Sequence, residues 1–295
     1  MPNLKEVRIR IASVKSTQQI TSAMKMVAAS KLRRAQNAIL KMRPYAAKLK
    51  DILQNLSASL ESGDISVFSQ QRNPDKVLVV VINSNRGLCG AFNSNVLRTA
   101  VQRIQNEYSS QHSTGNVSVL TIGRKATEFF SKRGYTVVSS HDSVFDNLTY
   151  DNVSAIASTV MDAFASKKFD RVDIIYNQFK NAVVQLVTVE QLLPVETPVE
   201  TAVVTKSNTD YIFLPEKEQI VAELIPKSLK IQFYKAVLDS YASEHGARMT
   251  AMHQATDNAG DLIKELNLAY NKARQAAITK EILEIVSGAE ALKNQ

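Results

Sequence analysis

The residues most suggestive of chemistry form the loop SNRGLCG, residues 84–90, between the apolar run VLVVVI and a helical pattern. A strand, a glycine-containing loop and a helix N-terminus form phosphate sites in many nucleotide-binding proteins. Arg86 could meet an anion, and Gly87 and Gly90 would let the backbone approach a ligand. The segment therefore has the shape of a phosphate cradle.

The motif elements that complete such a site are missing. A dinucleotide fingerprint needs G-x-G-x-x-G, and a P-loop needs a second glycine followed by Lys and Ser or Thr. Here the two glycines are spaced G-x-x-G, no such pair follows, and no acidic residue is placed to bind a ribose. Cys89 has no histidine near it in the sequence, and none of the four histidines has a metal-ligand spacing. We therefore expect Arg86, Gly87, Cys89 and Gly90 to form a structural loop, with no catalytic residue, cofactor or metal site.

The elements that must position this loop alternate between strands and helices. Three apolar runs, VLVVVI, VSVLTIG and YTVVSS, each precede a helical pattern, and VDIIYNQF and AVVQLVTVEQLL are close enough for a hairpin. Such alternation is typical of a mainly parallel sheet covered by helices. The sequence thus predicts an α/β domain of Rossmann-like type over residues 76–193.

Long helical patterns occupy both ends of the chain. No proline lies between Pro2 and Pro44 or after Pro226, and apolar residues recur at steps of three and four. Two such helices on either side of one domain can pair only antiparallel, so we expect a coiled coil with the α/β domain inserted in it. The predicted segments are an N-terminal helix (1–60), the α/β domain (76–193), a connector (194–226) and a C-terminal helix (227–295).

The coiled-coil seam changes character along both helices. Between Val14 and Ala28 its positions hold Gln18, Thr21 and Lys25, while three apolar residues lie one position away: Ile20, Met24 and Val27. A local change of partner would explain this shift, and a stutter within one coiled coil is the alternative. The C-terminal helix carries an alanine-rich seam, followed from residue 278 by a rotated one, which indicates a second partner.

Charge is concentrated at one end of the chain. The net charge is +8, but residues 1–60 hold twelve Lys or Arg and two acids, and therefore +10. This predicts an acidic neighbour: nucleic acid, a lipid surface or a partner's lining. Tyr45 is the only aromatic residue there, which disfavours nucleic acid. No apolar run could span a bilayer, the start MPNLKEVRIRIASVK lacks a signal-peptide core, and one cysteine fits a reducing compartment.

Three blocks together resemble one known family. They are ITSAMKMVAASKLRRAQ in the first helix, SNRGLCGAFN in the loop and NKARQAAITKEILEIVSGAEAL at the C-terminus. In this order they are similar to the gamma subunit of the F-type rotary ATP synthase, and the likeness spans essentially the whole chain. The resemblance implies a central-stalk rotor subunit, itself without an active site or cofactor. It couples ion-driven rotation to ATP synthesis and regulates ATPase activity.

The resemblance also implies partners and a location. The partners are the alpha and beta subunits of the catalytic ring, the epsilon subunit and the membrane ring of c subunits, with no nucleic acid. The protein would be peripheral, on the cytoplasmic face of the bacterial inner membrane, and would meet the membrane only through the complex. Proton-driven and sodium-driven members both exist, so the coupling ion stays open.

Residue roles follow from the same resemblance. The positions that match contacts with a beta subunit are Met24, Lys25, Arg248, Arg274, Gln275, Thr279 and Glu281. The tip that would turn in an apolar bearing consists of Ile282, Ile285, Ala289 and Leu292, for which burial in the chain's own core is the alternative. Tyr211 and Phe213 match the region near epsilon and the c ring, although Phe213 could equally pack in the core.

Two rival functions make different predictions. An α/β enzyme with a nucleotide site at Gly87–Gly90 would bind nucleotide as an isolated chain, but it leaves both long helices unexplained. A coiled-coil scaffold that binds nucleic acid would show a strong salt dependence, but it gives no reason for the nearly neutral C-terminal helix.

Overall fold

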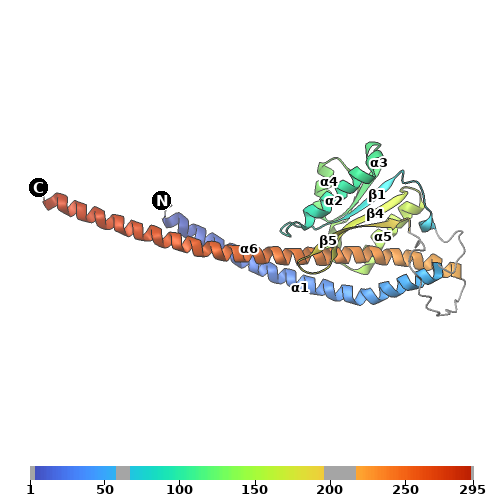
Figure 1. The fold of residues 1–295 in the computed structure, drawn as a ribbon, viewed down its shortest axis with the longest axis horizontal. Coiled ribbons are helices and arrows are strands. Elements are labelled where there is room, and N and C mark those ends of the chain that lie inside the picture. The colour runs from blue at the N-terminus through green and yellow to red at the C-terminus, as the bar shows by residue number, and fades with distance from the viewer. Residues whose placement is uncertain (1–3, 58–66, 196–216, 294–295) are drawn as a thin grey trace. The chain divides into compact units, whose positions relative to one another are not determined.

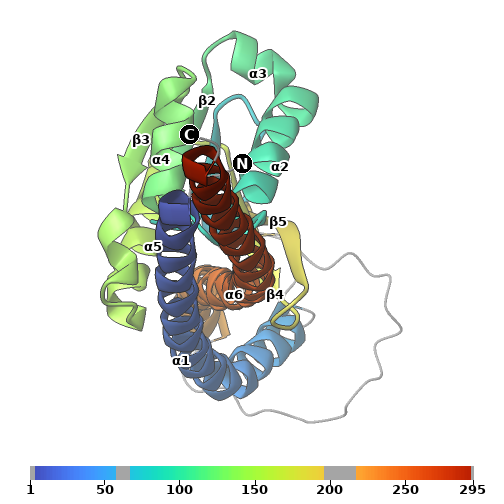
Figure 2. The same ribbon diagram turned by 90° about the vertical axis from the view of Figure 1, so that its left-hand side faces the viewer.

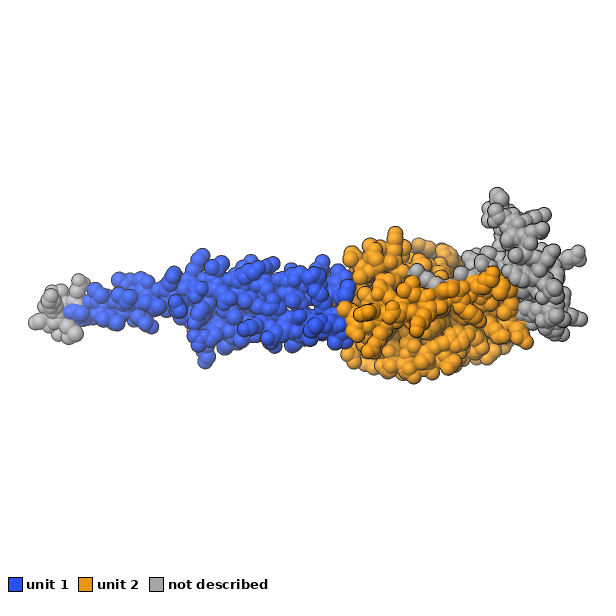
Figure 3. All heavy atoms as spheres, turned by 90° about the horizontal axis from the view of Figure 1, so that it is seen from below, with its two compact units in different colours: residues 1–28, 249–295 blue, residues 29–248 orange. Residues whose placement is uncertain are grey.

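The computed structural model describes residues 4–57, 67–195 and 217–293. The chain divides into two compact units, which Figure 3 shows in blue and orange. Unit 1 comprises residues 1–28 together with 249–295, and unit 2 comprises residues 29–248. Both long helices contribute a segment to each unit, and the two units are described separately below.

Unit 2 contains a five-stranded sheet with the order β3-β2-β1-β4-β5. Its strands are β1 (Val77–Ile82), β2 (Val117–Ile122), β3 (Thr136–Ser140), β4 (Arg171–Phe179) and β5 (Gln185–Leu193). Strand β1 pairs in parallel with β2 and β4, β2 pairs in parallel with β3, and β4 and β5 form an antiparallel hairpin. The predicted mainly parallel sheet with a final hairpin is confirmed.

Helices cover both faces of this sheet (Figures 1 and 2). One face carries α2 (Phe92–Glu107) and α4 (Arg124–Lys132), and the other carries α5 (Tyr150–Ala165) and part of the C-terminal helix α6. The short helices are η1 (Val67–Ser69), α3 (Ser109–Ser113) and η2 (Asp142–Phe145). Every β1 side chain is buried, as expected for a strand with helices on both sides.

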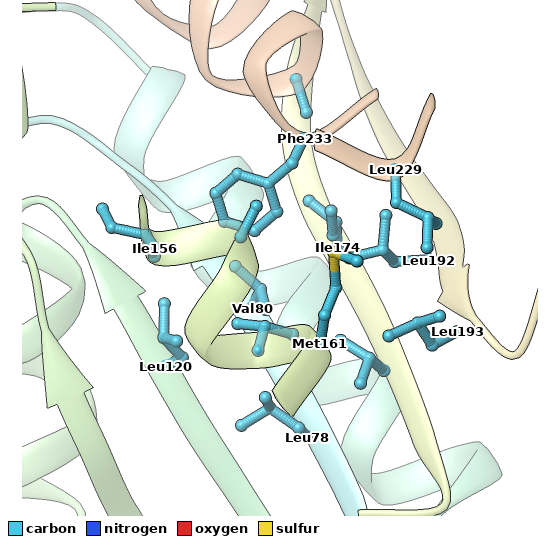
Figure 4. Packing of buried hydrophobic residues seen from close by; sticks show 14 of the residues in the cluster. Leu78, Val80, Leu120, Ile156, Met161, Ile174, Leu192, Leu193, Leu229 and Phe233 are labelled. Atoms are coloured by element: carbon cyan, nitrogen blue, oxygen red, sulfur yellow. The ribbon is translucent and has the colours of Figure 1, made fainter. Parts of the chain in front are cut away.

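Alternate residues of β1 enter two different cores. Val77, Val79 and Val81 pack with α2 and α4. Leu78, Val80 and Ile82 pack with α5 and with Leu229 and Phe233 of α6, as Figure 4 shows for Leu78 and Val80. Because side chains alternate between the two faces of a strand, every second residue of β1 faces α6. These residues pack with α6 in one continuous apolar cluster.

The two terminal helices are α1 (Leu4–Ser57) and α6 (Lys217–Lys293). Helix α6 begins at Lys217, ten residues before the predicted start at 227, because it continues through Pro226. A proline inside a helix loses one backbone hydrogen bond and crowds the preceding turn. Its neighbours Ile225 and Leu229 are buried in the core, and this packing offsets the loss.

In unit 1 the two helices pair antiparallel. Arg8 Nη2 donates to Tyr270 Oη at 2.8 Å, and the Thr21 and Thr256 hydroxyls are 2.8 Å apart. Residue numbers therefore rise along one helix as they fall along the other, with a constant register. The predicted antiparallel coiled coil with an inserted α/β domain is confirmed.

Within the helix pair, the α1 seam keeps its register where the apolar residues of the sequence shift by one position. The alternative of a stutter is therefore wrong, and the local change of partner stays a prediction. Thr21 is buried, whereas Ile20 and Val27 are each 57% exposed. The seam keeps its register because α6 offers polar or small partners: Thr256 faces Thr21, and a Cβ at Gly260 would lie 3.1 Å from Gln18 Nε2. A side chain that finds a hydrogen-bond partner can occupy a seam position at low cost.

Candidate functional site

The loop that follows β1 lies where ligands bind in many open α/β sheets. Strand β1 has β2 on one side and β4 on the other, so the chain reverses its direction of winding at this strand. Such switch points form ligand crevices at the carboxyl ends of the strands. A phosphate could bind here only if the polar groups of the loop and of the neighbouring helix N-termini were free.

The chain's own polar side chains fill the interior of the loop. The Ser84 hydroxyl lies 2.7 Å from the Arg86 carbonyl oxygen and 2.8 Å from Asn93 Oδ1. Asn93 Nδ2 donates to Cys89 Sγ at 3.2 Å. Ser84 and Cys89 are buried, and burial raises the pKa of the Cys89 thiol. The loop interior is thus a closed hydrogen-bond network around a protonated thiol.

The first turn of α4 is also occupied. Asn85 Oδ1 accepts from the Arg124 amide at 3.0 Å, and the Ser84 carbonyl accepts from the Lys125 amide at 3.0 Å. These amides would otherwise be available to an anion. Gly123 fits because its φ is +106° and a Cβ there would lie 2.2 Å from the Asn83 carbonyl oxygen. The loop therefore caps α4 and occupies two amides of that helix that could otherwise bind a phosphate.

Helix α6 contacts the same loop through a buried ion pair. Arg248 Nη1 and Nη2 donate to Glu244 Oε1 at 3.1 and 2.7 Å, and Nη2 also donates to the Arg86 carbonyl oxygen at 3.3 Å. Both side chains are about one-tenth exposed. Burial raises the pKa of Glu244, while Arg248, Lys31 and Arg86 oppose this rise. The guanidinium thus links one turn of α6 to the backbone of the loop.

The outer edge of the loop is exposed. Leu88 has a φ of +63° and is 66% exposed, and Gly90 has a φ of +59°. A leucine in the left-handed region is uncommon and needs surrounding structure to hold it. The predicted loop residues divide accordingly: Cys89 points into the network, and Arg86, Gly87 and Gly90 lie on its surface.

The residues of α1 that resemble beta-subunit contacts lie in unit 1. Met24 and Lys25 are half-buried beside the seam, and Lys25 Nζ is 3.4 Å from His253 Nδ1. His253 Nδ1 is in turn 3.3 Å from Asp257 Oδ2, and both of these side chains are more than half exposed. Lys25 is therefore partnered within the helix pair, and Met26 beside it is exposed.

The remaining predicted contacts lie toward the end of α6, where Arg274, Gln275, Thr279 and Glu281 are all exposed. Thr279 donates only to the carbonyl of Gln275, one turn earlier, at 2.9 Å. Every residue from 278 to 289 is exposed, including the predicted tip residues Ile282, Ile285 and Ala289. The large side chains of Ile282 and Ile285 are not buried by any other part of the described chain.

Some predicted residues fall outside what can be described. Tyr211 and Phe213 lie outside the described residues, and Leu292 lies on α6 without a described side-chain position. Glu244, the ion-pair partner of Arg248, was not among the predicted site residues. Their i,i+4 spacing, with the acid on the N-terminal side, is the signal that could have found it.

Within residues 4–57, 67–195 and 217–293, no group of His, Cys, Asp or Glu side chains could hold a metal ion. In the same ranges, no helix has both the length and the apolar character needed to cross a bilayer.

Comparisons with known proteins agree with this architecture. The family model described as ATP synthase matches residues 3–292. The ATP synthase gamma chain of Cytophaga hutchinsonii is 54% identical over 295 residues, covering 100% of both chains. That of Flavobacterium psychrophilum is 57% identical over 293 residues, covering 99% of this chain and 100% of the relative.

A solved structure shows the same fold. A chain in the central stalk and c ring of the Tetrahymena thermophila mitochondrial ATP synthase has a TM-score of 0.60 and 29% identity, covering 80% of this chain and 99% of that one. The family model, with its match over residues 3–292, extends over both long helices and the α/β domain between them in sequence. The chain therefore belongs to the ATP synthase gamma-chain family, whose members form the central stalk of the F-type enzyme.

Proposed function

We propose that this chain is the rotor that couples rotation of the membrane c ring to conformational change in the catalytic beta subunits. Ion-driven rotation of this chain would cause ATP synthesis on the beta subunits. The same chain would regulate the ATPase activity of the complex when it hydrolyses ATP. The chain would carry no active site of its own. It would be held at the cytoplasmic face of the bacterial inner membrane by its partners in the complex.

The observation that carries this proposal is the exposed end of α6. Five large apolar side chains lie in an exposed stretch of twelve residues, 278–289: Ile278, Ile282, Leu283, Ile285 and Val286. An isolated helix of this length is marginal in water, and an apolar surface of this kind marks an interaction site. A surrounding ring of alpha and beta subunits would supply the missing cover.

The proposed contacts are those that the family resemblance assigns to this chain. Arg274, Gln275, Thr279 and Glu281 would meet a beta subunit, together with Met24 and Lys25 of α1. Arg248 matches the same group of contacts, but its side chain is buried in this chain. Ile282, Ile285, Ala289 and Leu292 would turn in the apolar bearing. Tyr211 and Phe213 would contact the epsilon subunit and the c ring. A ring changes state only if it binds the shaft differently at each angle, and two unlike helices supply that difference.

The test is ATPase activity of purified alpha and beta subunits with the full chain, without it, and with a chain truncated after Asn271. We expect sustained hydrolysis only with the full chain, because the truncation removes four of the proposed beta contacts and the tip. The isolated chain should neither bind nor hydrolyse ATP. Nucleotide binding by the chain alone, with no effect on alpha and beta, would overturn the proposal in favour of an α/β enzyme.

A further inference from the structure

Arg248 matches a beta-subunit contact by resemblance, yet in the described chain Arg248 is 8% exposed and Glu244 is 7% exposed. A surface contact needs an exposed group, yet Arg248 directs its described hydrogen bonds to Glu244 and to the Arg86 carbonyl. Removing two charges from water is costly unless both are hydrogen-bonded. A buried ion pair at this position therefore suggests a specific structural role for its hydrogen bonds.

The hydrogen bond from Arg248 to the Arg86 carbonyl oxygen indicates this role. Arg86 and Arg248 are 162 residues apart in sequence, and the bond joins a turn of α6 to the loop after β1. The same Arg86 carbonyl oxygen lies 2.7 Å from the Ser84 hydroxyl, so it is held from both sides. We propose that Arg248 is a positioning residue that fastens the loop Ser84–Ala91 to helix α6.

This inference rests on the proposed rotor function for its purpose. A loop that holds Leu88 in a left-handed conformation and projects it into solvent needs support from the interior. Arg248 gives that support from the helix that must carry the torque. Force applied to the α/β domain then passes to α6 through the loop as well as through the apolar core.

Cys89 provides a built-in reporter of the fastening. It is the chain's only cysteine, it is 1% exposed, and Asn93 and Ser84 hold it within the same network. The rate of maleimide labelling of the folded full chain, relative to the denatured chain, measures how often the loop opens. With Arg248→Met we expect labelling to rise at least tenfold, because the Arg86 carbonyl loses its donor from α6.

A charge-swap variant separates fastening from simple ion pairing. Glu244→Arg with Arg248→Glu keeps the pair on α6, but a carboxylate at 248 cannot donate to the Arg86 carbonyl. We expect labelling of the swap to stay as fast as in Arg248→Met. Recovery of the slow rate in the swap would overturn the proposal. If Arg248→Met does not fold by circular dichroism, Arg248→Lys, which keeps one donor, should label at an intermediate rate.

The matched control uses the exposed Glu223–Lys227 pair, which has the same i,i+4 spacing on the same helix. Glu223→Gln should leave the labelling rate unchanged. In assembled complexes in inverted vesicles, Arg248→Met should lower the number of ions pumped per ATP hydrolysed at least twofold, with proton and sodium uptake both measured. Slow labelling with reduced pumping would instead support a direct beta contact and overturn the fastening. Fast labelling with unchanged pumping would overturn the torque role, and the truncation after Asn271 tests the rotor function independently.

Discussion

Two segments of the same helix, residues 229–248 and 278–289 of α6, have opposite surroundings. In the first, Phe233 is completely buried and packs into the core beneath the sheet (Figure 4). In the second, Ile285 is 71% exposed and its neighbours are exposed as well. Both segments are helical and both contain large apolar residues, so helix propensity does not distinguish them.

The difference lies in what the chain supplies to each segment. The strands, α5 and the loop after β1 cover residues 229–248, so this segment is stabilised within the chain. The described chain supplies no cover for residues 278–289, so this segment depends on a partner. Substitutions should therefore change stability in the first segment and coupling in the second.

The largest expected effect is in the buried segment. Phe233→Ala should lower the free energy of unfolding by about 3–5 kcal/mol, because it removes a fully buried ring and leaves a cavity. Urea unfolding of the full chain measures this loss. Leu268→Ala on the same helix is the control, since its side chain is 64% exposed and should matter little. An equal loss in both variants would contradict the comparison.

A second prediction concerns His245, which is 5% exposed and, among the described residues, has no hydrogen-bond partner at either ring nitrogen. Burial, together with Arg248 and Lys31, lowers its pKa from 6.5 to about 3. Between these values the unfolded chain binds a proton that the folded chain does not. Stability should therefore fall as pH drops through this window, by up to about 1.4 kcal/mol per pH unit.

The variant His245→Phe removes that proton and keeps the edge-to-face contact with Tyr241. Its free energy of unfolding should decline less than that of the natural chain between pH 7 and pH 5. Urea unfolding at both pH values gives the comparison, in which the titration of other groups cancels. Parallel declines in the two chains would show that His245 is solvated in the folded state.

A smaller effect is expected in unit 1, where Thr256 of α6 contacts Thr21 of α1. A double-mutant cycle with Thr21→Val and Thr256→Val should give a coupling energy of about 0.5 kcal/mol, at the low end for a hydrogen bond. The value is low because the two hydroxyl hydrogens also serve the carbonyls of Gln18 and Met252. A coupling energy of zero would mean that the two hydroxyls do not share a hydrogen bond in solution.

The smallest effect on stability is expected in the exposed segment. Ile285→Ser should change the free energy of unfolding of the full chain by less than about 0.5 kcal/mol, because the side chain is mostly in water already. The same variant should lower ATP-driven ion pumping in the assembled complex, measured as proton and as sodium uptake. Lys272→Ala, also exposed on α6, is the control for both measurements. A large loss of stability would show that the segment is covered by its own chain.

Much of the fold could be predicted because local patterns decide it. Six consecutive apolar residues in β1 indicate a strand buried on both faces, and all six are buried. The seam of α1 could not be read in the same way, because Gln18, Thr21 and Lys25 look unsuited to a helix interface. Their partners on α6 are defined only when the register of the pair is known. Likewise, Pro226 signals a helix boundary in sequence, but packing of its neighbours overrides that signal.

For the candidate site, too, some features follow from local sequence and others depend on contacts between distant residues. The strand-loop-helix order, the lack of phosphate-binding motif elements and the apolar end of α6 can all be read from neighbouring residues in the sequence. The bond from Arg248 to the Arg86 carbonyl and the contact between Thr21 and Thr256 depend on how the chain folds. Those contacts join residues 162 and 235 positions apart, and no local periodicity encodes which distant groups will share a buried hydrogen bond.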